Sequence, residues 1–461
     1  MRGFSKFLVF LILLVVIVGG VAWLWAGRQP PPAVQFRQPD KFVGQTTELE
    51  LMVQAPQGQL SRLDVSVEQN GKSYPVFSLD RPTQATTRQD AADRFYVMRP
   101  IGKRAIPDLQ AGPARIVVHA ARPVLRGLRQ LASETTRDVQ VRLEPPQASV
   151  VSTFHYVNLG GAEFVIYRAT PADVESGVRV GDRTYPGFPG TAVGIKSDPA
   201  VHVAFFALSY DQDVKTPISV FARDPAGNVA VAVLEHMPFS KPFSRSTIPI
   251  DRWVARVVPP IVANTPEMKL STAPEDLVQT FVRINGDLRR SNAQTIAELA
   301  RKTAPEMMWK EPFEPLTNAA VEAKFADFRT YTYMGKEIDR QVHLGFDLAV
   351  TQQVPIKAAQ RGVVVHAAYL GIYGNCVIID HGLGVQTLYG HLSSIGVKVG
   401  DKVDKGQVIG RSGMTGLAAG DHLHFTVLVN GTPVNPVEWW DMKWMQDRVF
   451  RKIMEAGGSV T

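Results

Sequence analysis

Residues 374–382 read Gly-Asn-Cys-Val-Ile-Ile-Asp-His-Gly, a short apolar run enclosed by glycines. Glycines next to short apolar runs occur again nearby, in residues 362–365 and in residues 400–410. β-Branched residues between closely spaced glycines favour short strands joined by tight turns. The sequence therefore predicts a compact antiparallel β domain over residues 315–442, which we expect to fold on its own, and a C-terminal tail over residues 443–461.

Two further β regions precede this domain. Apolar and polar residues alternate with a period of two in many short segments, such as Glu-Leu-Glu-Leu-Met-Val at residues 48–53. Pro145-Pro146 marks a boundary between the two regions, and the turn at residues 224–228 resembles the terminal hairpin of bacterial immunoglobulin-like modules. We therefore expect a β-sandwich module at residues 36–145 and an immunoglobulin-like β-sandwich module at residues 146–245.

Helical signals lie between these modules and the C-terminal domain. Residues 272–275, Thr-Ala-Pro-Glu, have the pattern of a capping box, and apolar residues follow them at helical spacing. Residues 291–294, Ser-Asn-Ala-Gln, repeat the signal. The sequence predicts a short helical hairpin at residues 272–303, inside a linker that spans residues 246–314. The chain as a whole is thus predicted to be mainly β.

The N-terminal segment is the most apolar part of the chain. Residues 7–26 read FLVFLILLVVIVGGVAWLWA and carry no charge, which is long enough to cross a bilayer once. A signal peptide usually has a shorter apolar core, and residues 20–22 offer only a mediocre cleavage site. The length of the segment therefore predicts an uncleaved single-pass anchor in the inner (cytoplasmic) membrane at residues 1–28. Because basic residues precede the segment, the positive-inside rule places the N-terminus in the cytoplasm. The rest of the chain, after a stiff proline-rich linker at residues 29–35, would lie in the periplasm.

Net charge and motifs indicate which partners to expect, and the cysteine count limits disulfide formation. The formal net charge of +7 suits anionic lipid or an acidic polymer, and it equally suits a solvated basic face. No nucleic-acid-binding motif is recognisable, so we expect no nucleic-acid partner. The single cysteine, Cys376, excludes an intramolecular disulfide, and its apolar neighbours predict a buried strand residue rather than a nucleophile or a metal ligand.

The histidines of the C-terminal domain form a chemical pattern. In His422-Leu423-His424 the imidazoles at i and i+2 point to one side of a strand, and His343 and Asp347 add an imidazole and a carboxylate on a segment that contains a glycine. Two histidines and one carboxylate are a common catalytic zinc set with a position left for water, which the metal activates as a nucleophile. His391 and one histidine of the His-Leu-His pair are then candidates for general base and oxyanion partner.

Together these residues follow a recognisable order. His-x-x-x-Asp is followed by a histidine before leucine and then by His-x-His, and this sequence closely resembles the LytM/lysostaphin-type metallopeptidases over residues 328–438. The sequence around these positions also matches the family, at residues 379–382, 406–410 and 412–416. One departure is Thr426, where the family often has a glutamate. Another is residues 417–421, Leu-Ala-Ala-Gly-Asp, just before the His-x-His pair.

The resemblance implies a role for each matched residue. It assigns His343, Asp347 and His424 as ligands of Zn²⁺ and His391 and His422 as the catalytic pair. The implied substrates are the peptide stems of bacterial peptidoglycan, whose cross-links the enzyme would hydrolyse. Two further histidines lie in this part of the chain: His381 matches a structural position of the family, and His366 has no assigned role.

Other functions compete with this interpretation. A non-catalytic cell-wall-binding protein or an activator of a cell-wall amidase could share the fold, although such relatives typically lack one or more site residues. A periplasmic adaptor of an efflux system would share the anchor and the β modules, but it needs no metal-type residues and carries a long heptad hairpin. The β modules are candidate binding sites for cell-wall or division proteins. The sequence does not specify which peptide bond is cut.

Overall fold

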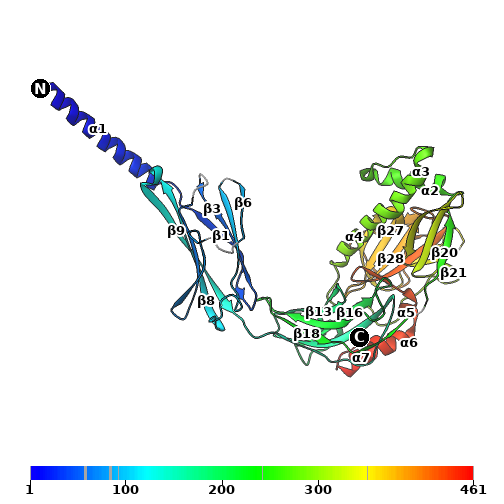
Figure 1. Ribbon diagram of the computed structural model, residues 1–461. Helices are drawn as coiled ribbons and strands as arrows, with labels where there is room; N and C mark the ends of the chain where they lie inside the picture. Colours follow the sequence, from blue (N-terminus) through cyan, green and yellow to red (C-terminus); the bar gives the residue numbers. More distant parts are fainter. Residues whose placement is uncertain are drawn as a thin grey trace. The chain divides into compact units, whose positions relative to one another are not determined.

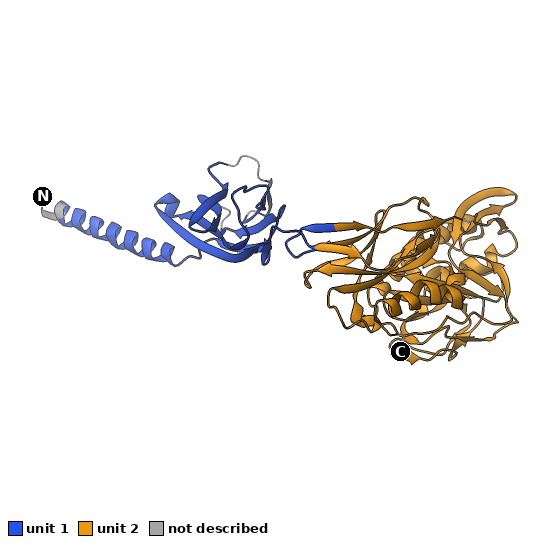
Figure 2. Ribbon diagram, turned by 90° about the horizontal axis from the view of Figure 1, so that it is seen from below, with its two compact units in different colours: residues 1–146, 223–230 blue, residues 147–222, 231–461 orange. Residues whose placement is uncertain are grey.

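The structure is a computed structural model that describes residues 2–56, 60–81, 86–91, 93–240, 242–349 and 351–459. The chain divides into two compact units (Figure 2). Residues 1–146 and 223–230 form unit 1, and residues 147–222 and 231–461 form unit 2. Strands dominate both units (Figure 1), which confirms the prediction of a mainly β chain.

The predicted apolar N-terminal helix is present as α1 (Arg2–Gly27). Within the described residues, its stretch Lys6–Gly27 is the one helix long and apolar enough to cross a membrane. At its C-terminal end, Ala26 is buried against Val124 and Leu131 of the same unit. Arg129 also donates to the Trp23 carbonyl (2.7 Å).

Two sheets form the β part of unit 1, with strand orders β1-β3-β7-β6 and β2-β9-β8-β4-β5. Their strands are β1 (Ala33–Gln38), β2 (Phe42–Val43), β3 (Glu48–Gln54), β4 (Arg62–Gln69), β5 (Lys72–Ser78), β6 (Thr86–Ala91), β7 (Arg94–Pro100), β8 (Gly112–Val124) and β9 (Arg129–Val141). In β4, Leu63, Val65 and Val67 are buried and alternate with more exposed polar residues. One apolar core takes side chains from both sheets, for example Leu51 and Val65.

The second β region begins unit 2. Its sheets have the orders β10-β12-β16-β15 and β14-β13-β17-β18, and β11 pairs in parallel with β19. The strands are β10 (Gln147–Val150), β11 (His155–Asn158), β12 (Gly161–Thr170), β13 (Glu175–Val180), β14 (Arg183–Pro186), β15 (Phe188–Pro189), β16 (Val201–Leu208), β17 (Ile218–Arg223), β18 (Val229–Val233) and β19 (His236–Phe239). β16 is buried along almost its whole length, because it is central in its sheet.

The helices that follow do not form the predicted hairpin, so that prediction is wrong. After α2 (Val254–Asn264), the chain forms one continuous helical run of α3 (Leu277–Arg283), a π-helical turn η6 (Ile284–Leu288) and α4 (Arg289–Ala300). Ile284 and Leu288 both have right-handed helical backbone angles, so the chain does not reverse between them. The residues that suggested a second helix start lie inside α4, because the π turn carries the helix through Asn285-Gly286.

The C-terminal domain is built on a large sheet with the order β21-β24-β32-β28-β27-β26-β30, in which all pairs are antiparallel. β33 also pairs with β32, and two small sheets, β20-β22-β23 and β25-β31-β29, complete the domain. The strands are β20 (Arg245–Pro249), β21 (Ala320–Ala323), β22 (Asp327–Tyr333), β23 (Lys336–His343), β24 (Phe346–Ala349), β25 (Pro355–Lys357), β26 (Gly362–Tyr369), β27 (Asn375–Asp380), β28 (Val385–Leu392), β29 (Ser394–Ile395), β30 (Lys402–Val403), β31 (Val408–Arg411), β32 (His422–Val429) and β33 (Thr432–Val434).

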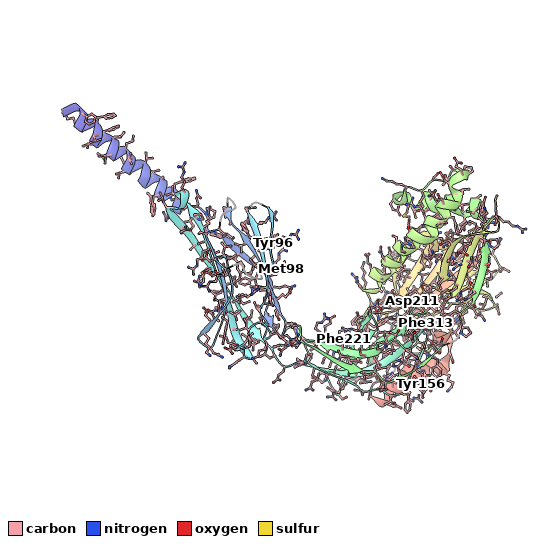
Figure 3. The ribbon with its side chains drawn as sticks, viewed as in Figure 1. Tyr96, Met98, Tyr156, Asp211, Phe221 and Phe313 are labelled. Carbon is pink, nitrogen blue, oxygen red and sulfur yellow. The ribbon has the colours of Figure 1, made fainter. Side chains whose placement is uncertain are left out.

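One apolar core is shared by the second β region and the C-terminal domain. Its centre is aromatic: Phe205 of β16 lies 5.9 Å from Trp309 and 5.6 Å from Trp439 between ring centroids. Phe313, labelled in Figure 3, lies 5.4 Å from Trp439 and 4.9 Å from the ring of His381. The second β region and the C-terminal domain are therefore parts of one packed unit.

The end of the chain is helical where the sequence predicted a tail. It forms α5 (Pro436–Trp440), α6 (Met442–Met445), the π-helical turn η8 (Gln446–Phe450) and α7 (Arg451–Glu455). Lys452 is buried and donates to the Glu163 carboxylate (2.9 Å) and the Phe164 carbonyl (2.8 Å) of β12. Arg448 lies over the ring of Tyr156, which is labelled beside these helices in Figure 3. These contacts fix the helices to the second β region.

Candidate metal centre

Neighbouring strands position the histidines and the aspartate. His343 ends β23, Asp347 lies on β24, and both histidines of the His-Leu-His pair lie on β32. In the antiparallel register Asp347 faces His424 directly, and Gly390 of β28 faces His424 from the other side. His391 is therefore next to the pair, and all five residues singled out from the sequence come together.

Gly345 allows the first two strands to approach β32. A Cβ at this position would lie 2.6 Å from His424 Cε1 and 2.6 Å from Thr426 Oγ1, which is closer than side-chain packing permits. The glycine between His343 and Asp347 is thus required by the close approach of the backbone to the His424 ring, and not by an unusual backbone angle.

Three ligand-type atoms converge at the centre of the site. His343 Nε2 lies 2.9 Å from Asp347 Oδ1 and 3.0 Å from His424 Nδ1, and His424 Nδ1 lies 3.0 Å from Asp347 Oδ1. All three side chains are buried. Each can offer one ligand atom within 4.8 Å of the others, so the group has the dimensions of a metal site.

The outer hydrogen bonds show which atoms carry protons. His343 Nδ1 lies 3.1 Å from the Lys324 carbonyl, which can only accept, so Nδ1 holds the proton. The Thr426 hydroxyl donates to the Leu344 carbonyl (2.9 Å) and therefore accepts from His424 Nε2 (3.0 Å). The inner nitrogens are then bare lone pairs facing a carboxylate oxygen. Three acceptors in such close contact need a cation between them, and a donor set of two imidazoles and one carboxylate fits a metal ion.

Asp347 is held in its ionised form. Burial raises the pKa of this carboxyl group, but the surrounding imidazoles, His343 first, lower the pKa by more, so that it stays well below its ordinary value. Asp347 Oδ2 accepts from Arg329 Nη2 (3.0 Å), and Arg329 Nε donates to Asp327 (3.1 Å). Ser246 donates to the same oxygen of Asp327 (2.6 Å). This chain of contacts fixes the carboxylate with its Oδ1 toward the ligand cluster.

His391 and His422 lie beside the ligand cluster, with their ring centroids 4.8 Å apart. His391 Nδ1 donates to the Thr415 carbonyl (2.8 Å), which leaves its Nε2 for other contacts. His422 Nδ1 donates to the Gly420 carbonyl (2.9 Å), and its Nε2 lies 3.5 Å from Asp347 Oδ1. His391 has a φ of 64°, a left-handed backbone angle that is strained in a residue other than glycine. The surrounding structure holds this strained residue in place.

The electrostatic environments of these two histidines differ. Burial, followed by the nearby charges of His422 and His424, lowers the pKa of His391 well below its ordinary value. Burial also lowers the pKa of His422, but the hydrogen bond and charge of Asp347, 3.5 Å away, raise it above the ordinary value. Burial lowers the pKa of His424 to about 4, despite the raising effect of Asp347, as suits a neutral ligand. The site therefore holds a neutral base beside an imidazole that retains its proton more readily.

All five residues line a cavity of about 260 Å³. Other walls come from Trp253, Arg289, Tyr331 and Tyr373, among others. The ring of Tyr373 lies 5.4 Å from that of His424. The ligand cluster therefore forms part of the cavity wall.

The sequence analysis missed the residues that orient the ligands. Arg329 and Asp327 hold Asp347, and Thr426 holds His424. The Asp-x-Arg spacing of Asp327 and Arg329 on a strand shortly before His343 was an available signal. Thr426 was noticed only as a departure from the family pattern.

Other sequence predictions in this domain fall outside the centre. His381 is buried and fixed between the Arg361 carbonyl and the Thr387 hydroxyl, both at 2.8 Å. Burial lowers the pKa of His381 to about 4, as expected of a residue that packs in the core. His366 contacts the Ala368 carbonyl (3.2 Å), and Cys376 is fully buried in β27.

Replacing Thr426 by valine is expected to weaken metal binding by roughly 10- to 100-fold, the usual cost of losing a partner that orients a ligand. Valine keeps the shape of threonine but cannot accept the proton of His424 Nε2. Competition with a chromophoric chelator measures the affinity. Thr330→Val on β22, outside the cavity lining, is the matched control. An unchanged affinity in Thr426→Val would contradict the role of the hydroxyl.

Comparison with known proteins assigns the C-terminal domain to a family. Residues 341–436 match the family model Peptidase family M23. The DD-carboxypeptidase/endopeptidase Mpg of Neisseria meningitidis serogroup B is 45% identical over 97 residues, which cover 21% of this chain and 22% of the relative. The peptidoglycan DD-endopeptidase ShyA of Vibrio cholerae is 45% identical over 96 residues, again 21% of this chain and 22% of the relative. The matches thus span about a fifth of each curated relative.

Solved structures of the same family are also similar. A crystal structure of a peptidase M23 protein from Pseudomonas aeruginosa matches 60% of this chain and 92% of its own, with 19% identity and a TM-score of 0.38. The catalytic domain of lysostaphin from Staphylococcus simulans matches 31% of this chain and 94% of its own, with 28% identity and a TM-score of 0.20. The family match and the two curated relatives show that residues 341–436 are a peptidase family M23 domain of the LytM/lysostaphin type.

Proposed function

We propose that this chain is a membrane-anchored zinc metalloendopeptidase that hydrolyses peptide cross-links of bacterial peptidoglycan. The observation that carries the proposal is the convergence of three buried acceptor atoms, from His343, Asp347 and His424, beside two further imidazoles in one cavity. This donor set suits Zn²⁺. When bound, the ion supplies Lewis-acid polarisation of the scissile carbonyl and activation of water.

The two remaining histidines carry the proton chemistry in this proposal. His391 is neutral and has a free Nε2, so it takes a proton from the attacking water as the oxygen–carbon bond forms. It returns that proton to the amine nitrogen as the carbon–nitrogen bond breaks. His422 retains its proton more readily, and its Nε2–H hydrogen-bonds the carbonyl oxygen as negative charge develops there.

The relatives' names suggest the bond. Mpg is named a DD-carboxypeptidase/endopeptidase and ShyA a peptidoglycan DD-endopeptidase, so we expect the D,D cross-link between peptide stems to be cut. Digestion of purified cell wall by the full chain, followed by mass spectrometry of the released fragments, tests the proposal. Release of uncross-linked peptide stems that stops after chelation and resumes on adding Zn²⁺ is expected. A wall left intact by zinc-loaded protein would favour the alternative, a cell-wall-binding protein or an amidase activator.

Alanine at His391 is expected to leave metal content unchanged and to lower turnover by roughly 10²-fold or more, the usual effect of removing a general base. The reason is that His391 contacts the Thr415 carbonyl and the neighbouring rings but is not one of the three converging ligands. Metal analysis and the rate of cell-wall digestion are measured together. His366→Ala, outside the cavity lining, serves as the control. Near-normal digestion by His391→Ala would remove the residue from the mechanism.

We further propose that α1 stays uncleaved and anchors the chain in the inner membrane, with the remainder in the periplasm. The helix is long enough to span the bilayer, and no charged residue interrupts residues 7–26. The protein is therefore expected to stay in the membrane fraction after high-salt and carbonate washes. A variant that begins at Gln29 is expected in the soluble fraction. A soluble product whose N-terminus is Trp23 would show cleavage and would overturn the anchor.

A further inference from the structure

One wall of the catalytic cavity comes from residues outside the family match. Trp253, just before α2, and Arg289, the first residue of α4, line the cavity together with the histidines of the M23 domain. Both precede the matched residues 341–436 by a wide margin in the sequence. This helical wall, residues 253–300, is therefore a feature that the family chemistry does not explain.

The helical wall is fixed to the M23 domain. Its apolar residues share a core with Tyr331 of β22 and Ile372. The buried Asn292 side chain accepts from the Ile372 amide (2.9 Å), and Arg256 donates to the Ala419 carbonyl at the cavity rim. Because apolar and polar contacts both hold it, the wall presents its side chains to the cavity at fixed positions.

Arg289 is held by neutral partners. Its Nε donates to the Asn285 carbonyl (3.1 Å), and its Nη2 donates to Asn285 Oδ1 (2.6 Å). Asn285 is fully buried, and its amide donates to Asp339 (2.7 Å), so the holder is itself fixed. In the described part of the chain, no aspartate or glutamate forms an ion pair with Arg289.

Neighbouring arginines show what is unusual about this one. Arg329, which lines the same cavity, is neutralised by Asp327 and Asp347. Arg290, the next residue on α4, points to solvent and pairs with Asp287. Among the described residues, Arg289 thus presents to the cavity a positioned guanidinium that forms no ion pair, although Glu322 lines the same cavity. A guanidinium of this kind is suited to a planar carboxylate, which it can bind through two parallel hydrogen bonds.

We propose that Arg289 binds a free carboxylate of the peptide substrate and so selects acidic over amidated peptides. This inference deepens the proposed peptidase function and names its substrate class. The carboxylate would lie against the helical wall while the scissile bond faces the histidines. Arg289 is a specificity residue in this arrangement, since it contacts none of the three ligand residues by hydrogen bond or ion pair among the contacts described.

The test compares one soluble cross-linked stem peptide in two forms, with free carboxylates and with the same carboxylates amidated. Binding is measured by calorimetry on metal-free full-length protein, so that the peptide is bound but not cut. Wild type is expected to bind the acid form roughly tenfold or more tightly than the amide, which is the size of a charge-assisted hydrogen bond. Arg289→Gln is expected to bind the two forms equally, whereas Arg290→Gln, the matched control on the same helix, keeps the preference.

Cleavage of the same peptides by zinc-loaded protein separates this inference from the proposed function. In wild type, the acid form is expected to have the lower KM at similar kcat, because the carboxylate contact is made equally in the bound and transition states. Equal binding of acid and amide by wild type overturns the role of Arg289 even if both are cut. A preference that survives in Arg289→Gln also overturns it. If neither peptide is cut but the preference in binding depends on Arg289, the inference stands and the proposed peptidase function fails.

Discussion

Replacing His424 by alanine is expected to abolish metal binding and cell-wall cleavage together. His424 supplies one of three converging acceptor atoms, and its ring centroid lies 5.7 Å from that of His391. Removing it leaves two ligands, which hold a catalytic zinc ion far less tightly than three. Elemental analysis of the purified variant and digestion of cell wall are the two measurements.

The control for this variant has to preserve the fold. His424 is buried on a central strand, so alanine leaves a cavity, and thermal unfolding of the metal-free proteins shows whether the variant is still folded. His422→Ala on the same strand is the matched comparison, because it should keep the metal and lose turnover. A folded His424→Ala protein that retains one equivalent of zinc would show that the ligand set differs from the one proposed here.

The sequence was a good guide to which residues meet at the centre. His-x-His on a strand places two imidazoles on one face whatever the fold, so His422 and His424 could be paired from spacing alone. Their meeting with Asp347 depends on the register of β24 against β32, which spacing does not give; the family resemblance supplied it. Arg329 was not predicted, because its link to Asp347 depends on how a separate small sheet, β20-β22-β23, lies against the large one.

The helices were harder to predict than the strands. Strand alternation in residues such as Leu63 and Val65 reports burial directly, since one face of each strand meets a core. Capping patterns report only a local preference, and Ser291 lies inside a continuous helix because the π turn before it keeps helical backbone angles. The position of Arg289 in the cavity follows from this continuity, because a hairpin would have turned α4 away from its observed path.

The boundary predicted at residue 315 falls beside a core that has no signal in the sequence, whereas the boundary predicted at Pro145-Pro146 coincides with the end of the first segment of unit 1. The core between the second β region and the M23 domain is a cluster of aromatic rings from separate segments, which has no periodic pattern. Trp309 and Phe313 lie in what the sequence indicates to be a linker, yet both are almost completely buried. Linker residues with this degree of burial carry packing energy that a boundary drawn at residue 315 would remove.

A fragment of residues 315–461 is therefore expected not to fold, in contrast to the expectation from sequence. It lacks Phe205, Trp309 and Phe313, and it would expose Trp439, which is fully buried in the complete chain. Losing a buried aromatic side chain costs about 3–5 kcal/mol, and domains are stable by only about 5–15 kcal/mol. The loss of three such partners, about 9–15 kcal/mol in total, is as large as this margin. Residues 147–461, which keep the whole shared core, are expected to fold and to bind metal.

Circular dichroism and thermal unfolding test whether each of the two fragments, residues 147–461 and residues 315–461, is folded. Residues 147–461 should show a cooperative transition, and residues 315–461 should show none or should aggregate. Within the longer fragment, Phe205→Ala is expected to destabilise by about 3–5 kcal/mol, while Met237→Ala, on an exposed position of β19, should change stability little. A soluble 315–461 fragment that unfolds cooperatively and binds zinc would show that the M23 domain is autonomous after all and that the aromatic cluster only joins two independently stable parts.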